Sequence, residues 1–353
     1  MFNRWNKYIK KLNNKKKTTI KDIANVLGIT PSAVSKALND HPRISNQTKL
    51  AVKQVAENLN YQPNQLATAL RKGKSHLVGV IIPRANSSFF SSVVQHMEEK
   101  LNQEGYNVII TQSNESYEKE CSNIDTLLQT QTDGIIASLA NETTNLKYYS
   151  KIKQKEVPLI MFDRSEDELK VDYIGIDDYM SSFLVVEHLV EQQCKRIAHI
   201  AGYRHTRIYK NRIKGFKDAL ENNGLAVDEN LILESALSIE DGRQIMTKLL
   251  QLPNPPDAVY AAGDYAALGA LQILKERNIN VPNDIALVGF SDEPFTSLIT
   301  PSITTVNQHS KKIGQLAANT FLKRVDNPLK NSEPENIILK PELIIRESSK
   351  KNL

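Results

Sequence analysis

Residues 19 to 39 constrain the fold of this chain most strongly, because they read as two short capped helices joined by a glycine turn. Thr19 and Asp22 stand at the spacing of a capping box, and apolar side chains recur at helical intervals behind them. Gly28 can adopt the positive φ that ends a helix, and Thr30 followed by Pro31 supplies an N-cap and a proline at the first helical position. We therefore predict one helix that starts at Thr19 and a second that starts at Pro31.

The second of these helices has the pattern of a helix that reads DNA. One face is apolar (Ala33, Val34, Ala37 and Leu38), and a polar set is left for solvent, base edges or phosphates: Ser32, Ser35, Lys36 and Asn39. A third helix is expected after the cap Ser45. An ordinary three-helix bundle with a tight turn would share these signals, so the pattern alone leaves both interpretations open.

Charge is distributed unevenly along the chain. Residues 1 to 76 carry 15 lysines and arginines against three acids, a net charge of +12, whereas the other residues carry 30 against 37, a net charge of −7. A solvated surface normally mixes both signs, so a compact basic block on an acidic chain indicates a polyanionic partner. Together with the helix pattern, this favours nucleic acid.

The third helix is followed by residues 61 to 72, which read YQPNQLATALRK. With this segment the pattern becomes typical of one protein family. The run from Thr19 to Lys74 resembles the N-terminal module of LacI/GalR-family transcription regulators, and the remaining chain resembles the effector-binding core of that family almost to its last residue. The resemblance implies a hinge helix after Pro63 that lies in the minor groove, with Leu70 as an apolar wedge. A flexible linker is the alternative for this segment.

The resemblance also implies which residues contact DNA. They are Thr19, Thr30, Pro31, Ser32, Ser35, Lys36, Asn39, Asn64, Ala67, Leu70 and Arg71. We expect the hinge to be disordered off DNA, because an isolated helix of about eight residues is marginal in water.

The long C-terminal part alternates apolar strand-like runs with amphipathic helices. The predicted strands are 77–82, 107–111, 134–138, 158–162, 196–201, 257–262 and 284–290, and two clear helices are 92–102 and 179–191. Nearly continuous apolar strands indicate parallel sheets covered on both faces, which is a doubly wound α/β architecture. About 275 residues exceed what one such sheet usually holds, so two lobes are expected.

The resemblance implies the same organisation, a two-lobed core like that of periplasmic binding proteins with three crossings between lobes, placed near residues 175, 305 and 335. The expected domains are a basic extension (1–17), a helix-turn-helix domain (18–62), a hinge and linker (63–75) and the effector-binding and dimerisation core (76–353). Within the core, lobe 1 is expected at 76–175 and 306–335, and lobe 2 at 176–305 and 336–347.

Ligands of open α/β sheets bind beyond the carboxyl ends of the strands. The positions that match or adjoin effector contacts of the family are Phe89, Phe90, Asp163, Arg212, Leu237, Asp264, Ser291 and Asp292. Carboxylates, an arginine and an aromatic ring suit a polyol such as a sugar. Leu237 stands where some relatives have a stacking aromatic residue, and Ser291 stands where several have an acid. The ligand of this chain therefore cannot be inferred from the ligand of any one relative.

Structural roles remain open for several of these residues. Asp163 and Asp264 can cap neighbouring turns or helices, Arg212 can form an ion pair within its lobe, and Phe90 can belong to the core. Phe89 is the better candidate for stacking on a sugar.

The sequence offers no catalytic constellation. None of the seven histidines stands at metal-ligand spacing or beside a nucleophile, and no phosphate or dinucleotide fingerprint follows a strand, so we expect no enzyme, no metal and no cofactor. His199 lies within an apolar strand and is expected to be a core histidine. Cys121 and Cys194 show no bridging pattern, which fits reduced cytosol, and no stretch is apolar enough to span a membrane.

We expect a cytoplasmic homodimer that represses transcription from an operator in double-stranded DNA, with an operator affinity controlled by a small-molecule effector. A dimer is expected because the chain stops soon after PELIIRESSKKNL, without the leucine-rich helix of tetrameric relatives. The alternative is a sugar-binding receptor or sensor without DNA function. The first 17 residues fit either a basic amphipathic helix that touches DNA or a membrane surface, or a disordered lead.

Overall fold

A computed structural model of the chain describes residues 18–62, 74–326 and 333–351. Its internal contacts divide the chain into two units, residues 1–75 and residues 76–353, which we describe separately. The basic extension and the hinge residues Asn64, Ala67, Leu70 and Arg71 lie outside the described residues.

The described part of the first unit is an N-terminal domain with the three predicted helices. They are α2 (Ile20–Leu27), α3 (Pro31–Leu38) and α4 (Asn46–Asn58). The local signals are confirmed: an oxygen of Asp22 accepts hydrogen bonds from the backbone N–H and the hydroxyl of Thr19 at 2.9 and 2.7 Å. Gly28 has φ 65°, and the hydroxyl oxygen of Thr30 accepts from the N–H of Ala33 at 3.2 Å.

These three helices pack around one small apolar core. Its buried members are Ile23, Ala24, Val34, Ala37, Val52, Val55 and Ala56. Val34 and Ala37 turn one face of α3 inward, so the residues on the opposite face of this helix are left for a partner.

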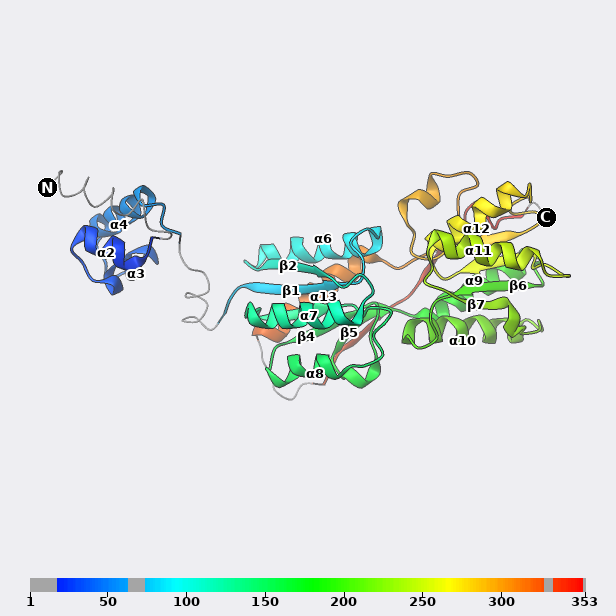
Figure 1. Ribbon diagram of the computed structural model, residues 1–353, viewed down its shortest axis with the longest axis horizontal. Coiled ribbons are helices and arrows are strands. Elements are labelled where there is room, and N and C mark those ends of the chain that lie inside the picture. The colour runs from blue at the N-terminus through cyan, green and yellow to red at the C-terminus, as the bar shows by residue number, and fades with distance from the viewer. Residues whose placement is uncertain (1–17, 63–73, 327–332, 352–353) are drawn as a thin grey trace. The chain divides into compact units, whose positions relative to one another are not determined.

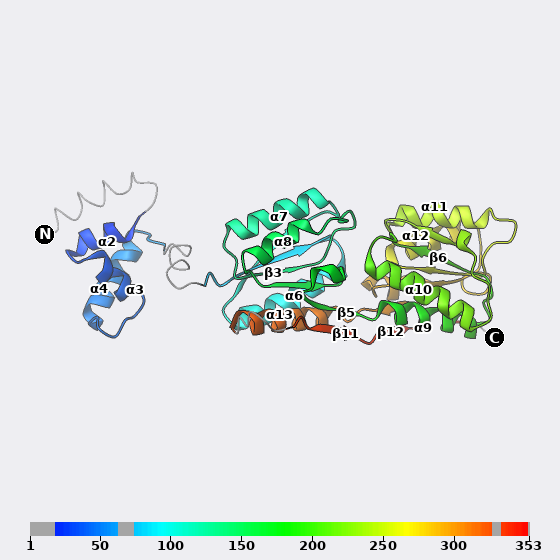
Figure 2. The same cartoon turned by 90° about the horizontal axis from the view of Figure 1, so that it is seen from below.

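The second unit is an α/β core with two parallel sheets (Figures 1 and 2). Lobe 1 is built on six strands in the order β11-β5-β4-β3-β1-β2. Its elements are β1 (Leu77–Ile82), α6 (Ser88–Gln103), β2 (Asn107–Gln112), α7 (Tyr117–Gln129), β3 (Gly134–Ala137), α8 (Lys147–Gln154), β4 (Leu159–Phe162), β5 (Asp172–Ile176), α13 (Ser310–Asp326) and β11 (Asn336–Leu339). Helices α6 and α13 cover one face of this sheet, and α7 and α8 cover the other (Figure 2).

Lobe 2 is built on four strands in the order β7-β6-β8-β9. Its elements are α9 (Asp178–Glu191), β6 (Ile197–Ala201), α10 (Arg207–Asn222), β7 (Ile232–Glu234), α11 (Ile239–Leu250), β8 (Ala258–Ala261), α12 (Asp264–Glu276) and β9 (Ala286–Val288). Helices α9 and α10 pair on one face, and α11 and α12 pair on the other (Figure 2). Three short 3-10 helices complete the core: Asp167–Leu169, Glu229–Leu231 and Pro294–Ser297.

The seven predicted strands are all present, each within two residues of its expected start and end, and the two predicted helices appear as α6 and α9. The strands β5, β7 and β11 were not predicted. Two further short strands, β10 (Thr305–Asn307) and β12 (Glu342–Ile344), pair antiparallel where the chain passes between the lobes.

One expected boundary is wrong. We placed residues 336–347 in lobe 2, but β11 pairs with β5 in the lobe 1 sheet, with Ile337 opposite Ile174. The last crossing therefore follows Leu339. The run NIIL is an edge strand with two exposed residues, and such a short apolar run suits either sheet equally well, so the sequence could not choose between them.

His199 lies in the middle of β6 and is fully buried, as expected for a core histidine. Its Nδ1 lies 3.0 Å from the carbonyl oxygen of Tyr260, and its ring stacks on the Tyr260 ring at 4.4 Å. Its Nε2 has no hydrogen-bond partner among the described residues. Burial lowers the pKa of His199 to about 3, so the imidazole is neutral at physiological pH.

A His199→Gln variant is expected to lose less stability in acid than the unmodified protein. Unfolded histidine has a pKa of about 6.5. As the pH falls below that value, the unfolded imidazole takes up a proton and the buried one does not, so the free energy of unfolding falls until the pH reaches the folded pKa. Between pH 7 and pH 4.5 this loss should be about 2 to 3 kcal/mol larger in the unmodified protein, as measured by urea unfolding.

Buried carboxyl groups act in the opposite direction. Burial raises the pKa of Asp264 to about 7, so the stability cost of its ionisation is relieved as the pH falls. Because Asp264 is present in both proteins, its effect cancels in the comparison. If the unmodified protein and the His199→Gln variant lose the same free energy of unfolding between pH 7 and pH 4.5, burial of a neutral His199 is not the cause of the acid sensitivity.

Neither cysteine forms a disulfide: Cys121 and Cys194 are both free and buried. Among the described residues no group of histidine, cysteine or acidic side chains could hold a metal ion. No helix in the described ranges has the length and apolar character needed to cross a membrane.

Candidate functional site

The N-terminal domain exposes the polar face of α3 that is expected to contact DNA. Ser32, Lys36 and Asn39 are exposed, Ser35 is half-buried, and Thr19, Thr30 and Pro31 are exposed at the helix starts. The side-chain amide of Asn39 donates to the carbonyl of Ser35 at 2.7 Å and closes the end of the helix. The ammonium group of Lys36 has no partner in the described part of the chain, so it is available to a phosphate or a base edge.

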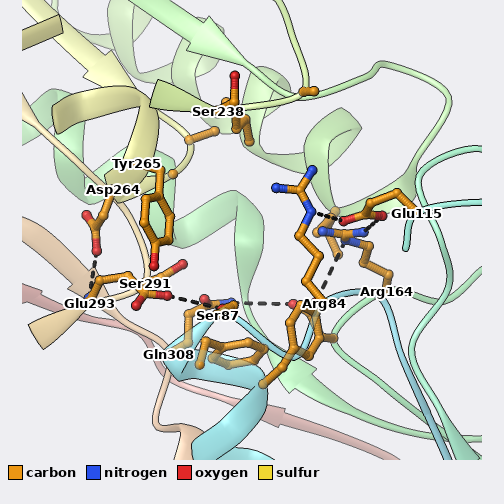
Figure 3. Close-up of a pocket in the computed structure, with 18 of the residues that line it drawn as sticks. Arg84, Ser87, Glu115, Arg164, Ser238, Asp264, Tyr265, Ser291, Glu293 and Gln308 are labelled. Atoms are coloured by element: carbon orange, nitrogen blue, oxygen red, sulfur yellow. Dashed lines mark hydrogen bonds and ion pairs between the residues drawn. The ribbon is translucent and has the colours of Figure 1, made fainter. Parts of the chain in front are cut away.

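The core contains a cavity of about 430 Å³ between lobe 1 and lobe 2, which we call the interlobe cavity (Figure 3). This volume falls in the range of small-molecule sites. Lobe 1 contributes the loop after β1, the start of α6 and the residues after β2 and β4. Lobe 2 contributes α10, the start of α11 and the residues after β8 and β9. The cavity therefore lies at the carboxyl ends of both sets of strands, as the parallel architecture predicts.

Seven of the eight expected effector residues line this cavity. They are Phe89, Phe90, Asp163, Arg212, Leu237, Asp264 and Ser291. Phe89 and Phe90 are both buried and pack edge to face at 5.1 Å, and Phe90 also contacts the core residue Phe162. Both aromatic rings therefore combine a core role with a place on the cavity wall.

Arg212 is held by a buried ion pair. Its Nε and one terminal nitrogen both lie 2.8 Å from the same oxygen of Asp178, and its other terminal nitrogen donates to the carbonyl of Ala262 at 3.2 Å. The guanidinium also lies over the ring of Phe290, at 3.5 Å from its centroid. Arg212 thus forms an ion pair within lobe 2 and also lines the cavity. The ion pair fixes the orientation of its guanidinium group.

Asp163 has few partners in the protein. It is buried with φ 56°, and its carboxylate accepts one long hydrogen bond, from the amide of Gln308 at 3.4 Å. Burial raises the pKa of Asp163, although Arg164 and Arg212 oppose the rise. A buried carboxyl group with free acceptor positions on a cavity wall can bind ligand hydroxyl groups.

Asp264 has a structural role as well. Its two oxygens accept from the N–H of Glu293 at 2.8 Å and from the hydroxyl of Thr305 at 2.7 Å. The first bond joins the start of α12 to the segment after β9, and the second joins it to strand β10. Asp264 lines the cavity with both oxygens already engaged, so its capacity for a ligand is smaller than the sequence suggested.

Asp292 is not among the residues that line the cavity, so its contact with an effector stays a prediction. Its carboxylate accepts from Arg346 at 2.8 Å, so one of its oxygens is already engaged within the protein. The neighbouring residues Ser291 and Glu293 face the cavity instead.

The wall also includes sixteen residues that were not among the expected contacts, and five of them matter most for the chemistry of the site. They are Glu115, Tyr209, Tyr265, Glu293 and Gln308. Glu115 follows β2, so extending the strand-end rule to this strand would have found it. Tyr209 lies three positions before Arg212 on the same helix face, which is also a signal in the sequence.

Glu115 brings together two arginines of lobe 1 (Figure 3). Its Oε1 lies 3.1 Å from Nε of Arg84, and its Oε2 accepts from a terminal nitrogen of Arg164 at 2.6 Å. Burial opposes the ionisation of Glu115, but Arg164, the N–H of Asn141 at 2.8 Å and Arg84 together outweigh it and hold the pKa of Glu115 below the ordinary value. The carboxylate is therefore charged and orients both guanidinium groups.

Glu293 bridges the two lobes. Its Oε1 accepts from the hydroxyl of Ser87 at 3.1 Å, and its Oε2 accepts from the N–H of Ser88 at 3.3 Å and from the Ser88 hydroxyl. Ser87 and Ser88 start helix α6 of lobe 1, whereas Glu293 follows β9 of lobe 2. A carboxylate of lobe 2 thus caps a helix of lobe 1, and the bonds exist only while the lobes are close.

One known protein-family model matches within each of the two units of the chain. Residues 19–64 match the model "Bacterial regulatory proteins, lacI family", and residues 186–349 match the model "Periplasmic binding protein-like domain".

Individual relatives cover nearly the whole chain. The HTH-type transcriptional regulator DegA of Bacillus subtilis (strain 168) is 31% identical over 334 residues, which span 94% of this chain and 98% of that protein. The probable HTH-type transcriptional repressor ExuR of the same organism is also 31% identical, again over 94% of this chain and 98% of that protein.

Among solved structures, the lac repressor dimer bound to operator and the anti-inducer ONPF superposes with a TM-score of 0.82 at 25% identity, over 95% of this chain and 99% of that one. A CelR–cellobiose complex gives a TM-score of 0.71 at 25% identity, over 94% of this chain and 100% of that one.

Proposed function

This chain belongs to the lacI family of bacterial regulatory proteins, and from that premise we propose that it is a repressor whose operator affinity is set by a small molecule bound in the interlobe cavity. Its family consists of DNA-binding transcriptional regulators, and this chain is one of them. The observation that carries the proposal is the cavity itself, which is lined by residues of both lobes in a chain whose N-terminal domain exposes a helix-turn-helix face.

We propose a sugar or a related polyhydroxylated metabolite as the effector. Asp163, with unused acceptor positions, and the donors of Arg212 suit adjacent hydroxyl groups, and Phe89 offers an apolar surface for a sugar ring. A solved relative of the same fold, CelR, has been determined with cellobiose. The chain is proposed to bind this ligand without chemical turnover.

The proposed mechanism is a population shift between lobe arrangements. Two protomers associate through their cores in the cytoplasm and present two N-terminal domains to a palindromic operator. The lac repressor, a relative of the same fold, has been determined as a dimer bound to operator. Residues 63–75 act as the hinge, in which Ala67 and Leu70 face the minor groove and Asn64 and Arg71 are further DNA contacts. The ligand binds one lobe arrangement more tightly than the other, and so does the operator. Ligand binding therefore changes the operator affinity, and operator binding must change the ligand affinity by the same factor.

The test is selection of genomic DNA fragments by the purified full-length chain, followed by titration of a selected fragment with and without candidate sugars. We expect one fragment class to bind well above bulk DNA, and one ligand to change that affinity by about fivefold to 150-fold, the usual range of coupling between sites. Binding of all fragments with equal affinity would overturn the DNA-binding role. Sequence-specific binding that no ligand alters would overturn the effector role.

A Lys36→Gln variant is expected to bind the selected operator with a weaker dependence on salt. Each phosphate contact that is lost flattens the slope of log affinity against log salt concentration by about one unit. The prediction rests on the exposed, unpartnered ammonium group of Lys36 on α3. Fluorescence anisotropy from low to high salt measures the slope.

Lys248 on α11 supplies the matched control, because it is an exposed lysine of the core. A Lys248→Gln variant removes the same charge and should leave the slope unchanged. If both variants change the slope equally, net charge rather than a contact from α3 is responsible.

A further inference from the structure

The lobe 1 wall of the interlobe cavity holds two arginines against one carboxylate. Arg84 and Arg164 each take one oxygen of Glu115, at 3.1 and 2.6 Å, and Figure 3 shows both guanidinium groups beside this carboxylate. A single negative charge cannot balance two guanidinium groups, which stay protonated in proteins. The group formed by Arg84, Arg164 and Glu115, which we call the arginine pair, therefore carries one surplus positive charge.

Both arginines keep donors that the described residues do not use. The Arg164 side chain is only 9% exposed, yet its Nε has no hydrogen-bond partner. The terminal nitrogens of Arg84 likewise make no hydrogen bond within the described ranges, and its side chain is 38% exposed on the cavity wall. A buried donor without a partner is costly, so an arginine placed only for structure would have its donors satisfied.

No other acid that lines the cavity accepts a hydrogen bond from the arginine pair, and Glu240 bonds to Gln244 of its own helix. Asp163 pairs with Arg164 at 3.9 Å from its Nε, which is beyond hydrogen-bond distance and leaves that N–H without an acceptor. Glu293 is occupied by Ser87 and Ser88 of α6. The oxygens of Asp264 are occupied by Glu293 N–H and Thr305. The unused donors of Arg84 and Arg164 are therefore available to a ligand.

We propose that the effector carries an anionic group, a carboxylate or a phosphate, and that Arg84 and Arg164 bind this group while Asp163 and Arg212 bind its hydroxyl groups. The inference rests on the proposed function and narrows the ligand to a sugar acid or a sugar phosphate. A guanidinium matches the two oxygens of either anion with parallel hydrogen bonds, and Glu115 orients both guanidinium groups before the ligand arrives.

The test compares anionic probes with their neutral parents on the full-length chain by isothermal titration calorimetry. The carboxylate arm uses D-glucuronate and D-galacturonate against D-glucose and D-galactose, and the phosphate arm uses D-glucose 6-phosphate and D-ribose 5-phosphate against D-glucose and D-ribose. We expect an anionic probe to bind about tenfold to a hundredfold more tightly than its parent, as two charge-assisted contacts allow. The arm that responds identifies the anion.

Variants separate the arginine pair from a general effect of charge. Arg84→Gln should reduce the affinity for the anionic probe by about tenfold or more and change the affinity for the neutral parent little. Arg84→Lys should recover part of the loss, because it restores the charge without the paired geometry. The matched control is Arg243→Gln on α11, which removes an arginine that pairs with the exposed Glu276 outside the cavity and should leave anion affinity unchanged.

Three results would overturn the inference: a neutral parent that binds as tightly as its acid, an Arg84→Gln variant that retains the full preference, or no binding by any anionic probe. The selection of operator fragments does not depend on Arg84. Sequence-specific DNA binding coupled to a neutral sugar would therefore leave the proposed function intact and remove only the anionic ligand.

Discussion

Replacing Arg212 with alanine is expected to lower the free energy of unfolding of the core by about 3 to 5 kcal/mol, the usual cost of removing one partner from a buried ion pair. Arg212 and Asp178 have side chains only 4% and 5% exposed and meet at 2.8 Å. Burial raises the pKa of Asp178 to about 6 although Arg212 opposes the rise, so the carboxylate depends on this arginine for its charge. Urea unfolding at pH 7 measures the loss.

A double variant separates this structural role from ligand binding. Arg212→Ala combined with Asp178→Asn removes both charges, so most of the lost stability should return, because no unpaired charge stays buried. The double variant should still fail to respond to effector in operator binding, since the donors of Arg212 on the cavity wall are gone. A stable double variant with a normal response would remove Arg212 from the effector site, and a single variant as stable as the unmodified protein would contradict the ion-pair argument.

The N-terminal domain could be predicted from sequence because its signals act over a few residues. Thr19 and Asp22 are three positions apart, Thr30 caps an N–H three positions ahead, and the left-handed turn needs only Gly28. Each interaction is closed within one helical turn, so the local sequence contains both partners. The packed core of the domain then follows from the apolar faces.

The location of the cavity could also be predicted, because parallel strands direct their carboxyl ends to one edge of a sheet. Asp163, Arg212 and Ser291 were assigned to it correctly, although they are far apart in the sequence. The direction of a side chain at that edge could not be predicted. Asp292 turns toward Arg346, which lies 54 positions further along the chain, and nothing near Asp292 in the sequence shows this partner.

Contacts between the lobes were the least predictable part. Glu293 and Ser88 are 205 positions apart and lie on separate sheets, so their contact depends on how lobes 1 and 2 come together. The sequence around Glu293 shows only an acid after a strand. The arrangement of the lobes, and not the local pattern, makes this acid the cap of α6.

Glu293→Ala is expected to shift the ligand-free core toward an open arrangement and to weaken effector binding by at least about tenfold. The variant removes three hydrogen bonds to Ser87 and Ser88, and bonds to a charged group contribute about 1.5 to 3 kcal/mol each. A ligand that touches both lobes binds only the closed fraction of the molecules, so its apparent affinity falls in proportion to that fraction. Calorimetry with the effector measures the loss.

Distances between nitroxide labels at Gln95→Cys on α6 and Lys248→Cys on α11 report the arrangement of the lobes directly, since both positions are exposed on different lobes. The matched control is Glu240→Ala, which removes an acid of the same cavity wall whose carboxylate bonds only to Gln244 of its own helix among the described residues. Without ligand, Glu293→Ala should broaden the distances toward larger values, and Glu240→Ala should not. If both variants keep the distances of the unmodified protein, the Glu293 bridge does not hold the lobes together, and closure must come from the ligand alone.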